Sequence, residues 1–252
     1  MILFVLGWIV QGRILELDIK TFAVFCNTLQ AIAVGYLFSA IAFIHFNYRQ
    51  RLWLFGGSLF AYTLLLILPI LPGIGRSVLL PERSFAWYVD QIVLGRFQDG
   101  TQYTWVLSGL GFFATTMSGV FAGELIKSSL PRNKVALYLF LSGTVLFFAG
   151  ALLGIWHPVI KKLWTSSFVL ASSGVCFALL SIFYWIIDVK GKSSWAYPLK
   201  VIGMNALVAY VLSHVFNFHL IAEMLLFGLK QYVGDFYYLT LTIGGFSFLY
   251  LI

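Results

Sequence analysis

The sequence predicts an all-α fold, a polytopic transmembrane helix bundle of about eight segments. Hydrophobic residues make up 61% of the 252-residue chain and charged residues only 10%, whereas a soluble domain is usually about 45–50% apolar and about a quarter charged. The mean hydropathy is +0.93. The charged side chains are too few to cover a globule of this size in water. We therefore expect lipid to surround most of the chain.

Long apolar runs locate the expected crossings, because about 20 apolar residues span the hydrocarbon core of a membrane. The run 1–11 is too short and looks like the tail of a helix that begins upstream. Glu223 and Lys230 interrupt the run 219–233, which we expect to be an interfacial or re-entrant helix. The last run, 236–252, is slightly short. The runs that are long enough to cross are 22–46, 52–71, 103–125, 135–154, 163–187 and 198–216.

These runs define one expected domain. We expect residues 1–252 to form a single transmembrane domain that lacks its N-terminal helices, with the first and last segments incomplete. Small residues four positions apart let helix backbones approach closely. The pairs Gly119 and Gly123, and Gly150 and Gly154, therefore predict helix contacts.

The distribution of charge sets the expected orientation. The net charge of +7 would raise nucleic acid as a partner of a soluble protein. Here the bases form short clusters between apolar runs, so we expect no nucleic-acid partner. The loops that carry residues 49–51, 127–134 and 190–200 are basic with few acids, and we assign their face to the cytoplasm. Cys26 and Cys176 fall inside apolar runs, which predicts neither a disulfide nor a metal site.

Polar residues inside membrane runs are costly to place there and are therefore candidates for function. Asn205 lies within the run 198–216, in the segment Gly-Met-Asn. Asn27 and Gln30 are three residues apart and share one helix face. For each of the three, a hydrogen bond between helices is the alternative to a substrate contact.

Two histidines are candidate bases, because the pKa of imidazole lies near neutrality. His214 lies inside the run 198–216 and is the weak catalytic candidate, with packing and hydrogen bonding as the alternative. His157 precedes Pro158 in a loop, where we expect a solvated side chain.

Polar groups are densest between residues 156 and 167. Lys161 and Lys162 lie between Trp156 and Trp164, and three hydroxyl residues follow at 165–167. Adjacent ammonium groups at a helix start, with hydroxyls beside them, could hold a phosphate or a carboxylate. The alternative is an interfacial anchor of snorkelling lysines and tryptophans.

The loop 73–102 is the only extramembrane segment with room for structure of its own. Within it, residues 85–97 place apolar side chains at helical spacing, with Asp90 and Arg96 on the polar side. We expect an amphipathic helix on the membrane surface, which could cap a site.

Five motifs along the chain resemble the heparan-α-glucosaminide N-acetyltransferase family, and their order and spacing match its bacterial members. They are AWYVDQIVLG at 86–95, LSGLGFFATTMSGVFAG at 107–123, PVIKKLWTSSFVL at 158–170, IDVKG at 187–191 and VIGMNALVAY at 201–210. The resemblance implies a multi-pass acyltransferase of the bacterial inner membrane. Acetyl-CoA would be the co-substrate on the cytoplasmic side, and a sugar amine or hydroxyl the acceptor on the far side, with no metal.

The resemblance also implies site residues. Lys161, Lys162 and Trp164 match an extracytoplasmic motif of the family, and Asn205 matches its Gly-Met-Asn. We expect the residues that bind substrate or co-substrate to be Asn205, Lys161, Lys162, Trp164, Gln30, Asp90 and Arg96. Partners expected from the resemblance are membrane lipids and a sugar or glycan acceptor, with a homo-oligomer left open.

Two departures from the family pattern limit this expectation. The family's catalytic His lies in a loop before the stretch at which residue 1 aligns, so the catalytic residue is unknown. The family motif Leu-Gln-Arg-Ile stands here as Leu29-Gln30-Ala31-Ile32, so any contact of that Arg with CoA phosphates is lost or supplied elsewhere. The alternatives are a transporter or lipid-handling membrane protein without covalent chemistry, or an inactive fragment.

Overall fold

The computed structural model describes residues 2–12, 14, 20–68, 70–71, 75–76, 78–215, 218–229, 232, 236–239 and 241–244. They divide into two compact units, Met1–Gly191 and Lys192–Ile252, which are described separately below. The regular elements of the described residues are helices, apart from a two-residue antiparallel ladder of β1 (Ile70–Leu71) with β2 (Gly75–Arg76). The all-α class expected from the sequence is confirmed, and the single domain stays a prediction.

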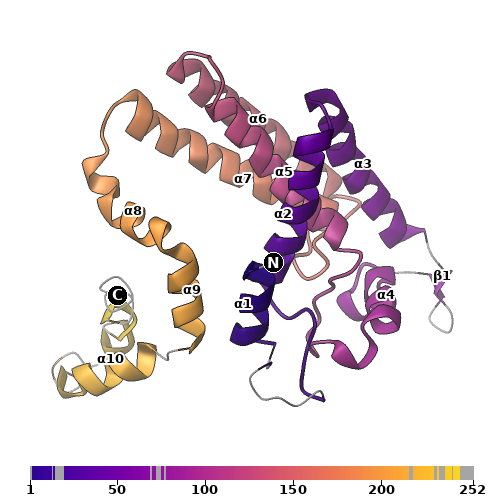
Figure 1. Cartoon of the computed structure of the whole chain (residues 1–252), viewed down its shortest axis with the longest axis horizontal. Helices are drawn as coiled ribbons and strands as arrows, with labels where there is room; N and C mark the ends of the chain where they lie inside the picture. The colour runs from indigo at the N-terminus through magenta and orange to yellow at the C-terminus, as the bar shows by residue number, and fades with distance from the viewer. Residues whose placement is uncertain are drawn as a thin grey trace. The chain divides into compact units, whose positions relative to one another are not determined.

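Figure 1 shows the elements in chain order. Those of the first unit are α1 (Ile2–Val10), α2 (Thr28–His45), α3 (Tyr48–Ile67), η2 (Pro81–Arg83), α4 (Phe85–Val93), η3 (Gly95–Phe97), α5 (Gly109–Ile126), α6 (Arg132–Leu153), α7 (Ser166–Tyr184) and the π-helix η4 (Trp185–Val189). Those of the second unit are η5 (Ser194–Ala196), α8 (Tyr197–Met204), α9 (Ala206–Val215), α10 (Phe218–Leu226) and η6 (Phe227–Leu229).

Five helices in the described part of the chain are long and apolar enough to cross a membrane: α2, α3, α5, α6, and α7 continued by η4. They coincide with the first five long runs expected from the sequence. The sixth run holds two helices, Ser194–Met204 and Ala206–His214, which meet at an angle of 61°. Counted as one span, this bent pair brings the candidate crossings in the described residues to six; the crossing expected over 198–216 stays a prediction. Most of the last run, 236–252, lies outside the described residues.

Asn205 marks the break between α8 and α9. Its backbone N–H bonds to Ile202 O, three residues back, at 3.1 Å, and its own φ and ψ of −113° and 20° are not helical. Its side-chain amide reaches Val201 O at 3.4 Å. A short polar side chain that competes for backbone groups favours such an interruption over a continuous helix.

Asparagine and threonine side chains define where three of the long helices begin. Asn27 accepts hydrogen bonds from backbone N–H groups at the start of α2, Asn47 and Gln50 form a reciprocal capping box at the start of α3, and Thr165 caps α7. Each cap satisfies backbone donors that have no partner inside the helix. The positions of these caps fix the register at which each helix enters the bundle.

The first unit is built around α5, which packs against both α2 and α3, while α6 runs along α7 (Figure 1). Glycines make the α6–α7 contact close. A Cβ at Gly150 would lie 2.4 Å from a backbone nitrogen of α7, and one at Gly174 would lie 2.4 Å from a backbone nitrogen of α6. Gly143 makes a similar contact at 2.8 Å. The contact predicted for Gly150 is confirmed, and Gly154 lies against the end of its own helix and Val159.

The connections of the first unit gather at two ends. At the end that we name the basic end, α2, α5 and α7 finish and α3 and α6 begin. There Arg51 pairs with Glu124, and Arg132 donates to the backbone oxygen of Asp188 at 3.0 Å. At the other end, which we name the loop end, the backbone N–H of Thr104 bonds to Lys162 O at 3.1 Å.

A buried hydroxyl network joins α3 to the segment before α7 at the loop end. The Tyr62 hydroxyl lies 2.9 Å from Ser108 Oγ and donates to the backbone oxygen of Leu163. Ser166 Oγ donates to Leu59 O at 2.8 Å. These contacts bridge positions about a hundred residues apart in sequence and hold three segments together.

Candidate functional site

A cavity of about 720 Å³ occupies the basic half of the interface between α2 and α5. Most of its wall is apolar, and the polar lining residues lie at three levels along the helices. Tyr36 is nearest the middle of α2, Ser39 and Thr116 follow, and Glu124 and Lys127 lie at the basic end. A concave, mostly apolar site with a few convergent polar groups is the usual form of a small-molecule site, and its volume lies in the common range of about 300–1,000 Å³. The residues that line it are Tyr36, Ser39, Ala40, Phe43, Ile44, Thr116, Val120, Gly123, Glu124 and Lys127.

The cavity exists because the interface is tight at one point and open at another. A Cβ at Gly35 would lie 2.5 Å from the backbone oxygen of Phe112, so the helices touch there. One turn further on, Ser39 Oγ and Thr116 Oγ1 hydrogen-bond at 2.7 Å. A Cβ at Gly123 would meet nothing within 4 Å. Gly123 therefore leaves room instead of making a contact.

This arrangement corrects the contact predicted for Gly119 and Gly123. Neither glycine has a neighbouring atom within 4 Å of an added Cβ. The spacing of small residues predicts that backbones can approach, but it does not say which face of the helix meets a partner. In α5 the face that meets α2 carries Phe112 and Thr116 instead.

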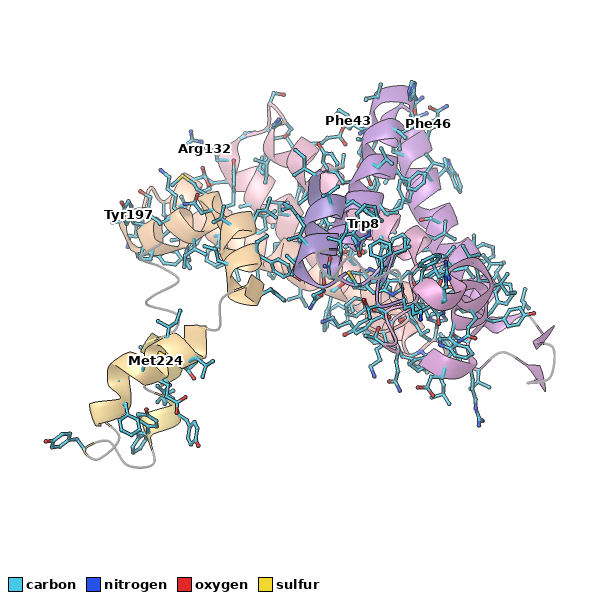
Figure 2. The ribbon with its side chains drawn as sticks, turned by 60° about the horizontal axis from the view of Figure 1, so that its bottom comes forward. Trp8, Phe43, Phe46, Arg132, Tyr197 and Met224 are labelled. Atoms are coloured by element: carbon cyan, nitrogen blue, oxygen red, sulfur yellow. The ribbon has the colours of Figure 1, made fainter. Side chains whose placement is uncertain are left out.

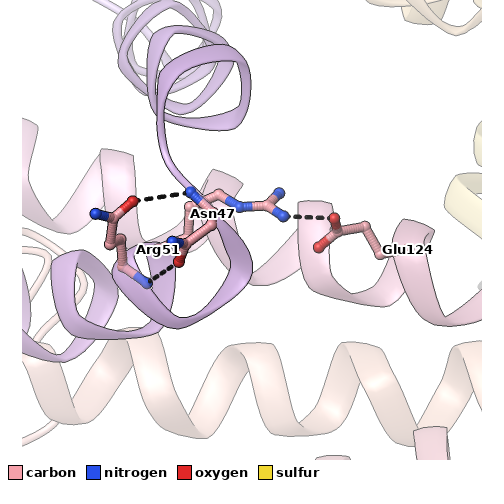
Figure 3. A network of polar contacts seen from close by, with 4 residues as sticks. Asn47, Arg51 and Glu124 are labelled. Atoms are coloured by element: carbon pink, nitrogen blue, oxygen red, sulfur yellow. Dashed lines mark hydrogen bonds and ion pairs between the residues drawn. The ribbon is translucent and has the colours of Figure 1, made fainter.

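A partly buried ion pair stands at the basic end of the cavity (Figure 3). Arg51 Nη2 lies 2.7 Å from Glu124 Oε1, and the guanidinium carbon lies 4.7 Å from the centroid of the Phe43 ring. Among the described residues, Arg51 Nε and Nη1 and Glu124 Oε2 have no hydrogen-bond partner although they are buried. Leaving such atoms unpaired is costly. Glu124 also lines the cavity, so a carboxylate borders it beside the arginine.

The remaining polar groups of the cavity differ in depth. Lys127 is exposed at its edge. Tyr36 lies nine residues before the end of α2, which is about 13 Å along a helix. A ligand with a charged end and a long, weakly polar arm would match this order of groups. Figure 2 shows Phe43 on α2 and Phe46 just beyond the end of that helix, at the basic end.

Asp90, a predicted site residue, is placed differently from its prediction. Its carboxylate is only 2% exposed and accepts the backbone N–H groups of Trp105 at 2.7 Å and Val106 at 2.9 Å. Ile92, on the apolar side of the helix expected at the membrane surface, is 65% exposed. The polar side predicted for Asp90 was therefore wrong, because the unpaired N–H groups that precede α5 required an acceptor. Burial raises the pKa of Asp90 to about 6, and its two backbone bonds limit the rise.

Gln30 is fully buried and holds the segment that leads into α2. Its Oε1 accepts the backbone N–H of Cys26 at 2.7 Å, and its Nε2 donates to Val24 O at 2.9 Å. Burial, with a smaller contribution from Asp99, raises the pKa of the Cys26 thiol to about 12. The contacts of Gln30 are therefore structural ones within the chain, and Cys26 is poorly suited to act as a nucleophile.

Lys161 and Lys162 are both exposed at the loop end. The ammonium group of Lys162 donates to Gln102 Oε1. The hydroxyls expected beside these lysines turn inward, since Thr165 and Ser167 both donate to Pro158 O at 3.0 Å. The anion site predicted for this segment combined the two ammonium groups with these hydroxyls. In the structure the ammonium groups are exposed and the hydroxyls are buried, so the two kinds of group are separated.

Trp164 is half-buried, and its backbone φ of 52° lies in the left-handed region. Its ring packs edge-on against Phe112 and Phe168, and its Nε1 donates to Thr115 Oγ1 at 3.0 Å. Because Gly111 has no side chain, the backbone of Trp164 can lie against α5; a Cβ there would be 2.8 Å from Trp164 O. Trp164 therefore connects the loop end to α5.

His157 is not the solvated loop residue that the sequence predicts. Its side chain is 1% exposed, its Nδ1 lies 3.5 Å from Ser167 Oγ, and its Nε2 has no partner among the described residues. Burial lowers the pKa of His157 from its usual value. The imidazole is consequently neutral at physiological pH.

Arg96 and the candidates of the second unit are exposed. The guanidinium of Arg96 lies 4.8 Å from the centroid of the Phe97 ring. In the second unit, His214 Nδ1 lies 2.9 Å from Tyr210 O, and the centroid of its ring lies 4.4 Å from that of the tyrosine, with the two rings tilted by 39°. Asn205 stands at the break between α8 and α9. In the described residues, no group of three or more His, Cys, Asp or Glu side chains is placed to hold a metal ion.

A comparison with models of protein families finds none that matches the chain, and a comparison with curated proteins finds no match. The resemblance to the N-acetyltransferase family and the site residues that it implies therefore stay predictions. The geometry of the cavity and of the two ends is independent of that resemblance.

The sequence analysis missed the residues that build the cavity. The sequence pattern indicates only a role in membrane orientation for Arg51 and Lys127, which belong to basic loops, and it indicates no site role for Glu124. One signal could have found them: Glu124 follows a glycine pair at the end of an apolar run, where an acid is costly unless it has a partner. The arginine that pairs with it lies 73 positions earlier and could not be identified from spacing.

Proposed function

We propose that the chain is a membrane-embedded acyltransferase of the bacterial inner membrane. It takes an acetyl group from cytoplasmic acetyl-CoA and moves it to a sugar amine or hydroxyl on the far side. The observation that carries the proposal is the cavity between α2 and α5, supported by the motif resemblance. An excess of bases marks the cytoplasmic side of a membrane protein; the cavity lies in the half of the α2–α5 interface nearest the basic end, which this proposal assigns to the side where acetyl-CoA is found.

The residues of the cavity fit the arm of an acyl-CoA. Lys127 at the edge supplies a cation for phosphate, and the apolar walls accept the pantetheine chain. The hydroxyls of Ser39 and Thr116 also line the cavity, and they bond to each other and to backbone oxygens of α5, so they add polarity to the wall without a free donor. When bound, the co-substrate supplies the activated acetyl group, while this chain orients it and excludes water.

The acceptor belongs at the loop end in this proposal. Lys161 and Lys162 are exposed there beside Trp156, which is 71% exposed. Exposed tryptophan and ammonium groups suit a polar, ring-shaped acceptor such as a sugar. We assign no catalytic base to the chain.

A substitution that fills the cavity tests the proposal. Gly123→Leu places a side chain in the cavity, and Gly119→Leu makes the same change on the same helix away from the lining residues. We expect acetyl-CoA at about 100 times its Kd to stabilise the detergent-solubilised full chain by about 2.7 kcal/mol, or roughly 5–10 °C in Tm. The Gly119→Leu variant should keep this shift, and the Gly123→Leu variant should lose it.

Two results would contradict the proposal. One is the absence of any shift with acetyl-CoA for the unsubstituted chain. The other is an equal shift for the two leucine variants, since that would place binding outside the cavity. Free CoA serves as a control for recognition of the nucleotide alone.

A second candidate function is that of a transporter or lipid-handling protein. The observation that favours it is the 61° break between α8 and α9, because interrupted helices often form ion and substrate sites in transporters. Flux of sugar across proteoliposomes without acetyl transfer would support this candidate over the first.

A further inference from the structure

A second, smaller groove lies between α6 and the end of α7, at the basic end. Its volume is about 290 Å³. Four of its apolar side chains are about half exposed, so the groove opens to the outside of the bundle. Because α6 and α7 are both long and apolar enough to cross a membrane, the medium outside them is expected to be lipid. The lining residues are Asn133, Ala136, Leu137, Phe140, Ser181, Ile182 and Trp185.

The polar end of the groove is bordered by two cations that the structure holds in place. Arg132 precedes the lining residue Asn133 and donates from Nη1 to Asp188 O at 3.0 Å. The ammonium of Lys190 lies 4.9 Å from the centroid of the Trp185 ring, which lines the groove. Figure 2 shows Arg132 at the start of α6.

The π-helix η4 explains how both cations reach the groove. Its wide turn closes with a hydrogen bond from the N–H of Lys190 to Trp185 O at 2.9 Å. A π-turn inside a helix is rare and is frequently found at functional sites. Here it leaves the backbone oxygen of Asp188 available to Arg132 and brings the Lys190 side chain back over Trp185.

The local charge is positive. Residues 132–140 and 181–190 contain three bases, Arg132, Lys134 and Lys190, and one acid, Asp188. From Asn133 to Phe140 the groove follows α6 for about 10 Å into the apolar part of the helix. The groove is therefore cationic at the membrane surface and apolar below it. These two parts are complementary to the anionic headgroup and the acyl chains of an anionic lipid.

We propose that this groove binds an anionic phospholipid of the cytoplasmic leaflet. The phosphate lies between Arg132 and Lys190, the indole of Trp185 lies at headgroup level, and one acyl chain follows Leu137, Phe140 and Ile182. Basic pockets between membrane helices on the cytoplasmic side recognise anionic headgroups in this way. A free phosphate would leave the apolar part unused, and a zwitterionic lipid would not match the net charge. The proposal is independent of acyl transfer.

Native mass spectrometry of the detergent-solubilised full chain tests the proposal. Phosphatidylglycerol and phosphatidylcholine are added separately, and the bound lipid is counted. Since each cation near a membrane surface contributes about a fivefold factor in affinity, we expect Arg132→Gln with Lys190→Gln to weaken phosphatidylglycerol binding roughly 25-fold. The matched control is Arg49→Gln with Lys127→Gln, which removes the same charge from the same end and should leave that binding unchanged.

A third variant separates the acyl chain from the headgroup. Leu137→Trp fills the apolar part of the groove and keeps both cations, so it should also weaken phosphatidylglycerol binding. The proposal is overturned if phosphatidylcholine binds as well as phosphatidylglycerol, or if the control pair loses as much affinity as the groove pair. It is also overturned if Leu137→Trp binds normally or if inorganic phosphate displaces the lipid, because the site would then recognise phosphate alone. Helical circular dichroism and gel filtration verify that each variant folds.

Discussion

The substitution Gly174→Ala tests the close contact between α6 and α7. The added Cβ would lie 2.4 Å from the backbone nitrogen of Phe147 and 2.7 Å from the backbone oxygen of Gly143. Ordinary contact begins at 3.4 Å, so the methyl group is about 1 Å too close. Both neighbours are backbone atoms, which cannot rotate away, and the helices must therefore separate.

The cost follows from this overlap. Overpacking a close contact typically costs about 1–3 kcal/mol, whereas alanine in place of glycine gains up to about 1 kcal/mol in a helix interior. Gly119→Ala is the matched control, because its Cβ meets nothing within 4 Å and it takes the same gain without the overlap. The difference between the two variants is therefore the overlap alone, about 1–3 kcal/mol in favour of Gly119→Ala.

Thermal unfolding in detergent, followed by the loss of the monodisperse gel-filtration peak, measures this difference. For a chain of this length, 1 kcal/mol corresponds to about 2–4 °C, so Gly174→Ala should melt about 2–12 °C below Gly119→Ala. Equal melting temperatures for the two variants would refute the reasoning, since they would mean that α6 and α7 do not meet at Gly174.

Three further predictions concern buried polar groups. Asp90→Asn should flatten the pH dependence of stability: the folded pKa of about 6 exceeds the usual 3.8, so the contribution of Asp90 is fully present below pH 3.8 and is lost as pH rises to about 6. The whole change amounts to roughly 3 kcal/mol, and thermal unfolding of both proteins between pH 4 and 7 measures it; parallel profiles would contradict it. His157→Gln should remove a pH dependence of the opposite sign. Burial lowers the pKa of His157, so the wild-type chain loses stability as pH falls below about 6.5, the usual value. If the difference in melting temperature between the two proteins is the same from pH 7.5 to 5, this prediction is excluded. Tyr62→Phe should cost about 1–3 kcal/mol, because it leaves the backbone oxygen of Leu163 and the hydroxyl of Ser108 with one partner fewer; denaturant titration against Tyr36→Phe, for which no such network is seen, measures it, and equal midpoints would argue against the network.

The crossing helices could be read from the sequence because run length alone determines them. Five of the six long runs each hold one long helix in the structure, and three of these helices begin at an asparagine or threonine cap. The sixth run is bent at Asn205. A run of apolar residues on both sides conceals the break, since hydropathy does not register how one asparagine competes for backbone hydrogen bonds.

The candidate site was harder to predict, because it depends on which residues meet from distant parts of the chain. Gly35 and Gly123 are the same residue type in similar helices, yet one touches a neighbouring backbone and the other borders the cavity. Asp90 and His157 were expected at the surface from local pattern, but both are buried by segments distant from them in sequence or by the fold of their own loop. The periodicity of a local sequence segment does not identify the residues that bury these side chains.

The hydroxyl network of α3 has a consequence for biogenesis. Tyr62 and Thr63 find partners at Leu163 and Ser166, about a hundred positions later in the chain. When α3 first enters the membrane, those partners have not yet been synthesised; Thr63 can donate to Leu59 O of its own helix, but the Tyr62 hydroxyl must be satisfied by water or by transient neighbours. The hydrogen bonds at the loop end can form only after α7 has been inserted. In a ribosome-bound chain that stops before residue 163, α3 and α5 should therefore lack these bonds and remain accessible to a protease or a chaperone.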